Sequence, residues 1–199
     1  FLAQIYSGGS AGAATNIPSA GSQPLCCNDR RWVGAFGLDG EYAIAWVEVG
    51  NLRLTRVAPN GVPAASPITP YAHGSLDPFT PISMVQHGGG VVLATCAAMV
   101  AVDPPAIAQP AVELTASVGA GRCLLASSGA TLRMVSLTGG LLEWRSVDET
   151  SGANPALRTL ATAAMAFDVA WDGEGFAVIW QEDLGPSGDG IFYAHVGCQ

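Results

Sequence analysis

Lysine is absent from this sequence, so all eight of its basic residues are arginines. Sixteen Asp and Glu residues leave a net charge of −8 at neutral pH. A chain of this charge is repelled by phosphate backbones and by anionic lipid surfaces. We therefore expect no nucleic-acid partner.

Long hydrophobic runs are absent as well. No apolar stretch reaches the roughly 18 residues that a membrane-spanning helix needs, and no signal-peptide pattern opens the chain. We expect no membrane span. The first residue is Phe1 and not Met, which is typical of a processed mature protein or of a trimmed chain. The cysteines favour the processed protein.

The five cysteines form no CxxC motif and no Cys/His cluster with zinc spacing, so we expect no structural metal. Disulfides formed in an oxidising compartment are the better interpretation. The alternative is that Cys96 and Cys123, both in apolar segments, are buried small hydrophobic residues. The odd count leaves one thiol over, which we expect in the adjacent pair Cys26 and Cys27.

Glycine and proline are abundant, at 25 and 13 residues, and nearly half of the chain is apolar. They are scattered without a period, which is typical of a turn-rich β protein with a sizeable core. Residues 156–167, rich in Ala and Leu, are the one candidate for a helix. The alternative for that region is a strand within residues 157–164.

One hairpin pattern occurs near both ends of the chain: an apolar strand, an Asp-Gly-Glu turn, and a second strand that ends in Trp. Asp-Gly between apolar runs is a strong hairpin signal, because Gly accepts the positive φ of a type I′ turn. A third strand with alternating side chains follows in each copy. The copies match at Asp39-Gly40-Glu41 with Asp172-Gly173-Glu174, at Trp46 with Trp180, and at 52–57 with 191–196.

Weaker copies of the pattern lie between these two, and four strands in 40 to 50 residues are typical of a propeller blade. We therefore predict an all-β, β-propeller-like domain of about four blades, each with three or four antiparallel strands. The alternative is part of a larger propeller that a second chain completes. The units lie near residues 31–70, 81–112, 113–155 and 165–199, and residues 7–24 form a surface loop.

These units suggest which cysteines meet. In units two and three, Cys96 and Cys123 fall in segments that we expect to be second strands, with 113–118 as the first strand of unit three. Neighbouring blades would bring these two thiols within bridging distance. The last unit lacks a fourth strand, so we expect residues 1–6 to pair with 191–196 and close the ring. Either Cys26 or Cys27 would then bridge to Cys198.

The segment VAWDGEGFAVIWQED, followed by GDGIFYAHV, resembles the blade repeat of secreted bacterial β-propeller proteins. The match is good over about 30 residues at the C-terminus and fair over residues 31–57. The resemblance implies a propeller fold and a secreted, periplasmic or cell-surface location. Members of such families do many things, so it implies no particular function.

Several residues lie where propellers often bind ligands. Aromatic rings with nearby carboxylates suit sugars, which stack on a ring and bond through their hydroxyls. The alternative for the tryptophans is packing between blades, and for the carboxylates simple solvation. The candidate ligand-binding residues are Trp46, Trp180, Glu48, Glu182, Asp183 and Tyr71.

Signals for other chemistry are weak. His73, His87 and His195 fall in different parts of the predicted blades, so we expect no shared metal site. No G-x-S-x-G motif indicates a serine hydrolase, and we assign no catalytic residue. The loop at 182–190 is rich enough in Asp and Gly for calcium but lacks the EF-hand spacing.

The sequence thus favours a secreted or cell-surface binding or interaction module, either lectin-like or a subunit of an assembly. Its partner would be a protein or a carbohydrate. The alternative is an extracellular hydrolase with an acidic cleft on one propeller face, in which paired carboxylates act as acid and base.

Overall fold

The computed structural model of the 199-residue chain describes residues 33–38, 40–48, 50–60, 62, 64, 66–74, 76, 80–103, 107–108, 110–114, 121–148 and 157–197. Our predictions for residues 1–6, for the loop 7–24, and for Cys26, Cys27 and Cys198 lie outside these residues. No helix in the part described has the length and the hydropathy that crossing a membrane requires.

Four antiparallel sheets make up the described chain. Sheet 1 holds β1 (Val33–Leu38), β2 (Glu41–Glu48), β3 (Asn51–Val57) and β4 (Ile68–Ala72). Sheet 2 holds β5 (Ser83–His87), β6 (Gly90–Ala94), β7 (Ala98–Asp103), β8 (Ile107–Ala108) and β9 (Val112–Glu113). Sheet 3 holds β10 (Arg122–Ser127), β11 (Leu132–Thr138), β12 (Leu141–Val147) and β13 (Arg158–Ala161). Sheet 4 holds β14 (Ala164–Trp171), β15 (Gly175–Asp183) and β16 (Asp189–Gly197), with the short helix η1 (Gly185–Ser187) in its last hairpin.

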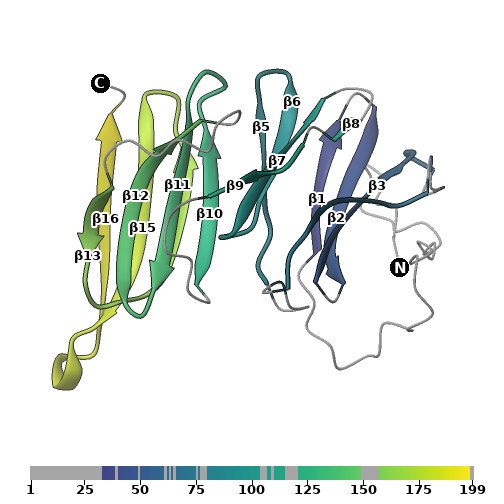
Figure 1. Cartoon of the computed structure of the whole chain (residues 1–199). Coiled ribbons are helices and arrows are strands. Elements are labelled where there is room, and N and C mark those ends of the chain that lie inside the picture. Colours follow the sequence, from purple (N-terminus) through teal and green to yellow (C-terminus); the bar gives the residue numbers. More distant parts are fainter. Residues whose placement is uncertain are drawn as a thin grey trace.

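The sheets stand side by side in chain order, from sheet 1 to sheet 4 across the view in Figure 1. In sheets 1, 3 and 4 consecutive strands are hydrogen-bonded neighbours, so each of these sheets is a simple meander. Sheet 2 differs, because β8 and β9 both pair with β7. The hairpin of β15 and β16, with η1 at its tip, extends beyond the end of the neighbouring sheet (Figure 1). The predicted all-β architecture of about four blades is confirmed.

Glycine closes the hairpins that the sequence predicted. Gly40 has a φ of 76° between the paired residues Leu38 and Glu41. Gly173 has a φ of 104°, and the Asp172 carboxylate accepts the N–H groups of Glu174 and Gly175 at 3.0 and 2.8 Å. Positive φ is easy only for glycine, so these turns fix where each hairpin reverses.

The hydrophobic core is divided into layers between successive sheets. Leu52 and Leu54 of sheet 1 are buried in one cluster with Leu93 and Val100 of sheet 2. The second layer contains Met99, Leu125 and Met134, and the third contains Leu142, Trp144, Phe176 and Val178. Sheets 2 and 3 therefore each have one face toward the preceding sheet and one toward the following sheet.

Cross-strand pairing gives the matching positions of the sheets. Trp46 pairs with Arg53 in sheet 1 and Trp180 pairs with Phe192 in sheet 4, so the two hairpins have the same register. Ala45 and Leu54 of sheet 1 therefore correspond to Ile179 and Tyr193 of sheet 4. The repeat that we identified in the sequence is thus a repeat in space.

Unit three differs from the prediction in its order of strands. Arg122–Ser127 is the first strand of sheet 3 and not the second, because it pairs with β11 alone. Val112 and Glu113 pair with Met99 and Ala98, so the start of the expected first strand belongs to sheet 2. An apolar alternating segment fits either sheet, and the sequence alone did not decide between them. The helix considered for 156–167 is wrong, since this region contains β13 and the start of β14.

The predicted bridge between Cys96 and Cys123 is confirmed, with their Cα atoms 5.3 Å apart. Its position differs in detail, because Cys96 lies in the turn between β6 and β7 and Cys123 lies in the first strand of sheet 3. The disulfide therefore joins sheet 2 to sheet 3 across their shared core layer.

Candidate functional site

In sheet 1 the candidate residue Trp46 is buried, and the candidate residue Glu48 forms an ion pair. Trp46 is buried with Ile44 and Val57 on the face of sheet 1 that is remote from sheet 2. The Glu48 carboxylate accepts the Nε–H of Arg53 at 2.9 Å. These contacts bury Trp46 beside residues of its own sheet and hold Glu48 in a cross-strand ion pair.

Tyr71, on β4, is also buried. Burial raises the pKa of its hydroxyl, and the charge of Glu113 together with a hydrogen bond to that carboxylate raises it further. Its ring stacks on the ring of His73, with centroids 6.1 Å apart. Tyr71 thus links the last strands of sheets 1 and 2.

The candidate residues of sheet 4 lie closer to the surface. The indole Nε1–H of Trp180 donates to the Glu182 carboxylate at 2.8 Å, and its ring stacks on Phe192 with centroids 5.8 Å apart. Phe167, paired with Trp180 on its other side, is buried under Arg122. An aromatic row of three rings therefore runs from the core to the half-exposed Phe192.

The predicted ligand-binding residues lie at opposite ends of the row of four sheets, which we call the array. Trp46 and Glu48 lie in sheet 1, Trp180 and Glu182 lie in sheet 4, and sheets 2 and 3 stand between them (Figure 1). Asp183 accepts the N–H of Gly185 at 2.7 Å at the tip of the last hairpin. The part of the chain described here contains no group of three or more metal-binding side chains, and calcium stays a prediction.

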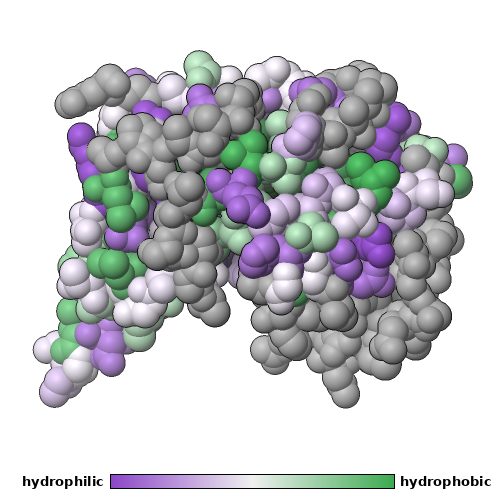
Figure 2. All heavy atoms as spheres, in the orientation of Figure 1, coloured by the Kyte–Doolittle hydropathy of each residue, from purple (hydrophilic) through white to green (hydrophobic). Residues whose placement is uncertain are grey.

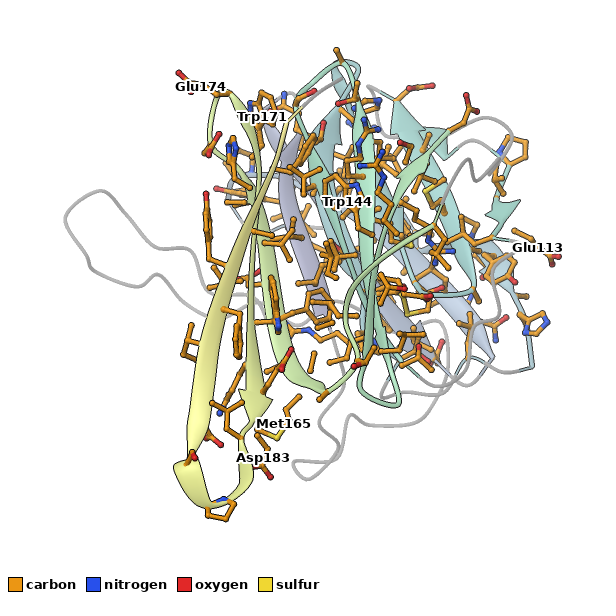
Figure 3. All side chains as sticks on the ribbon, turned by 90° about the vertical axis from the view of Figure 1, so that its left-hand side faces the viewer. Glu113, Trp144, Met165, Trp171, Glu174 and Asp183 are labelled. Atoms are coloured by element: carbon orange, nitrogen blue, oxygen red, sulfur yellow. A yellow bond between two sulfur atoms is a disulfide. The ribbon has the colours of Figure 1, made fainter. Side chains whose placement is uncertain are left out.

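A different surface stands out at the end of the array. We call the face of sheet 4 that points away from sheet 3 the end face. Figure 3 looks at sheet 4 from this side, with Glu174 and Trp171 toward one end and Met165 and Asp183 toward the other. By the register of the sheet, the end face consists of Ala166, Asp168, Ala170, Ala177, Ile179, Gln181, Asp183, Asp189, Ile191, Tyr193 and His195.

The end face is apolar at its centre and exposed. Ile191 is 73% exposed, Tyr193 is 60% exposed and Ile179 is 48% exposed. Their matching positions in sheet 1 are Leu52 and Leu54, at 0% and 1%, and Ala45, at 0%. Figure 2 shows hydrophobic residues along this margin of the molecule, interspersed with hydrophilic ones.

The other sheets bury the same positions. In sheet 2 the face toward sheet 3 includes Val92 and Met99, and in sheet 3 the face toward sheet 4 includes Val135, Leu142 and Trp144, all of them buried by the following sheet. The end face thus has the composition of a face that packs against a neighbour. Its exposure distinguishes it from the other three.

The charge pattern of the end face also follows that of sheet 1. In sheet 1 Arg56 pairs with Glu41 at one end of the face. The corresponding residue in sheet 4 is His195, whose Nε2 lies 3.1 Å from the Asp172 carboxylate. The N–H groups of Glu174 and Gly175 hold the pKa of Asp172 below its ordinary value, with a smaller contribution from His195.

Acidic residues line the rest of the end face. Asp168 lies beside Ile179, which in turn lies beside Tyr193. Asp183 pairs with Asp189 near the hairpin tip, and Asp189 accepts the side-chain N–H of Gln181 at 2.6 Å. No arginine occurs between residues 164 and 197, so this sheet is distinctly negative.

Reasoning from the sequence missed this surface, although the signal was present. The repeat aligned Ile191 and Tyr193 with Leu52 and Leu54, and it showed four units in a row. What it did not show is that one unit has no sheet against its second face in the described chain. That fact depends on the order of the sheets in space.

No protein-family model matches the sequence, and no curated protein matches it. Among solved structures the chain is similar to Kuenenia stuttgartiensis hydrazine synthase, with a TM-score of 0.57 and 14% identity over 80% of this chain and 48% of that one. It is also similar to Bacteroides ovatus xyloglucan PUL GH43B, with a TM-score of 0.52 and 9% identity over 83% of this chain and 38% of that one. The architecture is β-propeller-like. At these identities the likeness shows the fold alone, and the chain spans less than half the length of either structure.

Proposed function

We propose that this chain is a protein-binding module that forms part of a larger assembly and that the end face is its interface. The observation that carries this proposal is the exposure of Ile191, Tyr193 and Ile179 at positions that are buried in the other sheets. Fully burying each large apolar side chain contributes about 1.5–3 kcal/mol. Exposed apolar patches of this kind are typical of interaction sites.

The proposed setting is an oxidising one: secreted, periplasmic or at the cell surface. The bridge between Cys96 and Cys123 supports it, because disulfides persist mainly in such compartments. The resemblance of residues 169–196 to secreted bacterial propeller repeats supports the same location. We therefore also propose that the chain is related to those secreted propeller proteins.

Site-specific photo-cross-linking tests the interface. We would place p-benzoylphenylalanine at Tyr193 in the full chain, expressed in the organism that encodes it, and irradiate the cells. The control is the same replacement at Tyr42, which is 42% exposed and lies in sheet 1. We expect a discrete cross-linked protein species from position 193 and none from position 42. Absence of any cross-link from position 193 would contradict the proposed function.

Carbohydrate binding is a second candidate, favoured by the row formed by Phe167, Trp180 and Phe192. A stacked aromatic surface with the Glu182 carboxylate held by Trp180 suits a sugar ring and its hydroxyls. Titration with soluble xyloglucan, followed by Trp fluorescence, tests it against a Phe192→Ala variant. A hydrolase function remains the alternative, although its candidate carboxylates Glu48 and Glu182 lie in separate sheets.

A further inference from the structure

We infer that the end face is covered by a β-sheet of a different polypeptide, which packs as a further blade and carries basic residues at its rim. This inference rests on the proposed function and names the partner of that same surface. It follows from three observations: the repeated packing of the sheets, the charges around the end face, and the state of the opposite end of the array.

The repeated packing identifies the occupant as a sheet. In sheets 1, 2 and 3, the face that corresponds to the end face is covered each time by the next antiparallel sheet. The covering faces are built from β-branched, aliphatic and aromatic side chains such as Val91, Leu93, Leu125, Met134, Phe176 and Val178. The end face keeps the same pleat, register and apolar centre. Packed sheets lie face to face about 10 Å apart, with interdigitating side chains.

The charges argue against two copies packing through the same face. A two-fold interface brings each patch against itself. The end face carries Asp168, Asp183 and Asp189 and no arginine or lysine, so a second copy would offer these acids no arginine or lysine as a partner. Like charges brought together in an interface oppose association. A second copy is therefore a poor occupant.

The opposite end of the array argues against copies adding head to tail. Such addition needs the outer face of sheet 1 to be free. On that face Ile44, Trp46 and Val57 are 3%, 8% and 0% exposed within the single chain. These apolar side chains are therefore not exposed for a second copy to pack on.

A basic rim on the partner follows from the acids of the end face. The chain itself gives the precedent at the interface of sheets 3 and 4. There Arg122 of sheet 3 lies over the Phe167 ring, with its guanidinium carbon 5.4 Å from the centroid. Arg133 lies in the same way over Phe176 at 5.7 Å. Arginines at matching places on the partner would meet Asp168, Asp183 and the ring of Tyr193.

The test uses the cross-link from position 193. It identifies the segment that is cross-linked and measures how the yield depends on the charges of the end face. Peptide mapping by mass spectrometry should place the cross-link in a segment of another polypeptide with alternating apolar residues. In a variant with Asp168→Arg and Asp183→Arg, we expect the yield of the cross-link to fall about tenfold, since rim charges govern the rate of association. The matched control is Asp148→Arg with Glu174→Arg, which changes the net charge equally from exposed positions outside the end face, and it should leave the yield unchanged.

The outcomes separate this inference from the function on which it rests. A cross-link to a second copy of the chain, or to a helical segment, would overturn the inference while the chain remains a protein-binding module. A cross-link to a further part of the same polypeptide would overturn both the inference and the proposed function. Equal yields from the two charge variants would overturn the basic rim. Light scattering on the purified chain should show a monomer, and a dimer that Ile191→Asp dissociates would identify the second copy as the occupant. No cross-link at all would contradict the proposed function itself.

Discussion

Leu54 and Tyr193 occupy the same position in two copies of one hairpin, yet their surroundings are opposite. Leu54 is buried between sheets 1 and 2, whereas Tyr193 is 60% exposed on the end face. Leu54→Ala should lower the free energy of unfolding by about 2–5 kcal/mol, because it leaves a cavity in the core. Tyr193→Ala should change it by no more than about 0.5 kcal/mol. Urea denaturation of both variants measures the contrast, and equal losses would show that the end face is packed within the chain.

Asp172 makes the stability of sheet 4 depend on pH. The N–H groups of Glu174 and Gly175, then His195, hold its pKa below the ordinary value of 3.8. Because the folded pKa is the lower one, this stabilisation is present above pH 3.8 and is lost as the pH falls through the folded value. In the variant Asp172→Asn, the free energy of unfolding should therefore decrease less steeply as the pH falls below 3.8. Urea denaturation over a pH series tests this, and an unchanged slope would refute it.

At the scale of elements, the disulfide ties the β6–β7 turn of sheet 2 to β10 of sheet 3. It joins cysteines 27 residues apart, and a loop of that length contributes about 3.5 kcal/mol in the chain-entropy model. The double variant Cys96→Ser with Cys123→Ser should lose about that much unfolding free energy in urea. Reduction of the parent protein with dithiothreitol serves as the control and should give the same loss. A stability equal to that of the oxidised parent would show that the bridge adds nothing.

Our prediction for the N-terminus concerns the outer edge of β16, where we expect residues 1–6 to pair. If residues 1–6 pair with 191–196, deleting them should lower the melting temperature by several degrees, since edge pairing and burial are lost together. Cys198→Ser should do the same if Cys26 or Cys27 bridges to it. Calorimetry of the two variants measures both effects. A variant that lacks both features and melts like the parent would contradict this closure.

The sequence predicted those elements whose signals are local. Gly40 and Gly173 fixed two hairpins, and the matching Trp46 and Trp180 fixed their register. It assigned Arg122–Ser127 to the wrong place in its sheet, because an apolar strand does not reveal which neighbours it has. The same limit applied to the candidate site: Trp46 and Trp180 look equivalent in sequence, but only Trp180 lies near a surface. Burial depends on how many sheets flank a strand, and no local pattern encodes that number.

At the scale of the whole molecule, the exposed end face should bind apolar dyes. Ile191→Asn should reduce the fluorescence of bound anilinonaphthalene sulfonate by at least about a third, because Ile191 is one of three large apolar residues at the centre of the face. The control is Val62→Asn, which removes an exposed apolar residue at 53% exposure elsewhere in the chain. It should change the signal little. Equal effects of the two changes would show that the dye does not report on the end face.

The layered core has a further consequence for how the molecule comes apart. Sheets 2 and 3 each bury two faces against neighbouring sheets, whereas sheet 4 buries one. In arrays whose members touch only their neighbours, a terminal member detaches at the cost of a single interface. Amide protons of β14, β15 and β16 should therefore exchange with solvent before those of β6 and β11. Under a pulling force on the C-terminus, sheet 4 should come away first, as a discrete step, while the rest of the array stays folded.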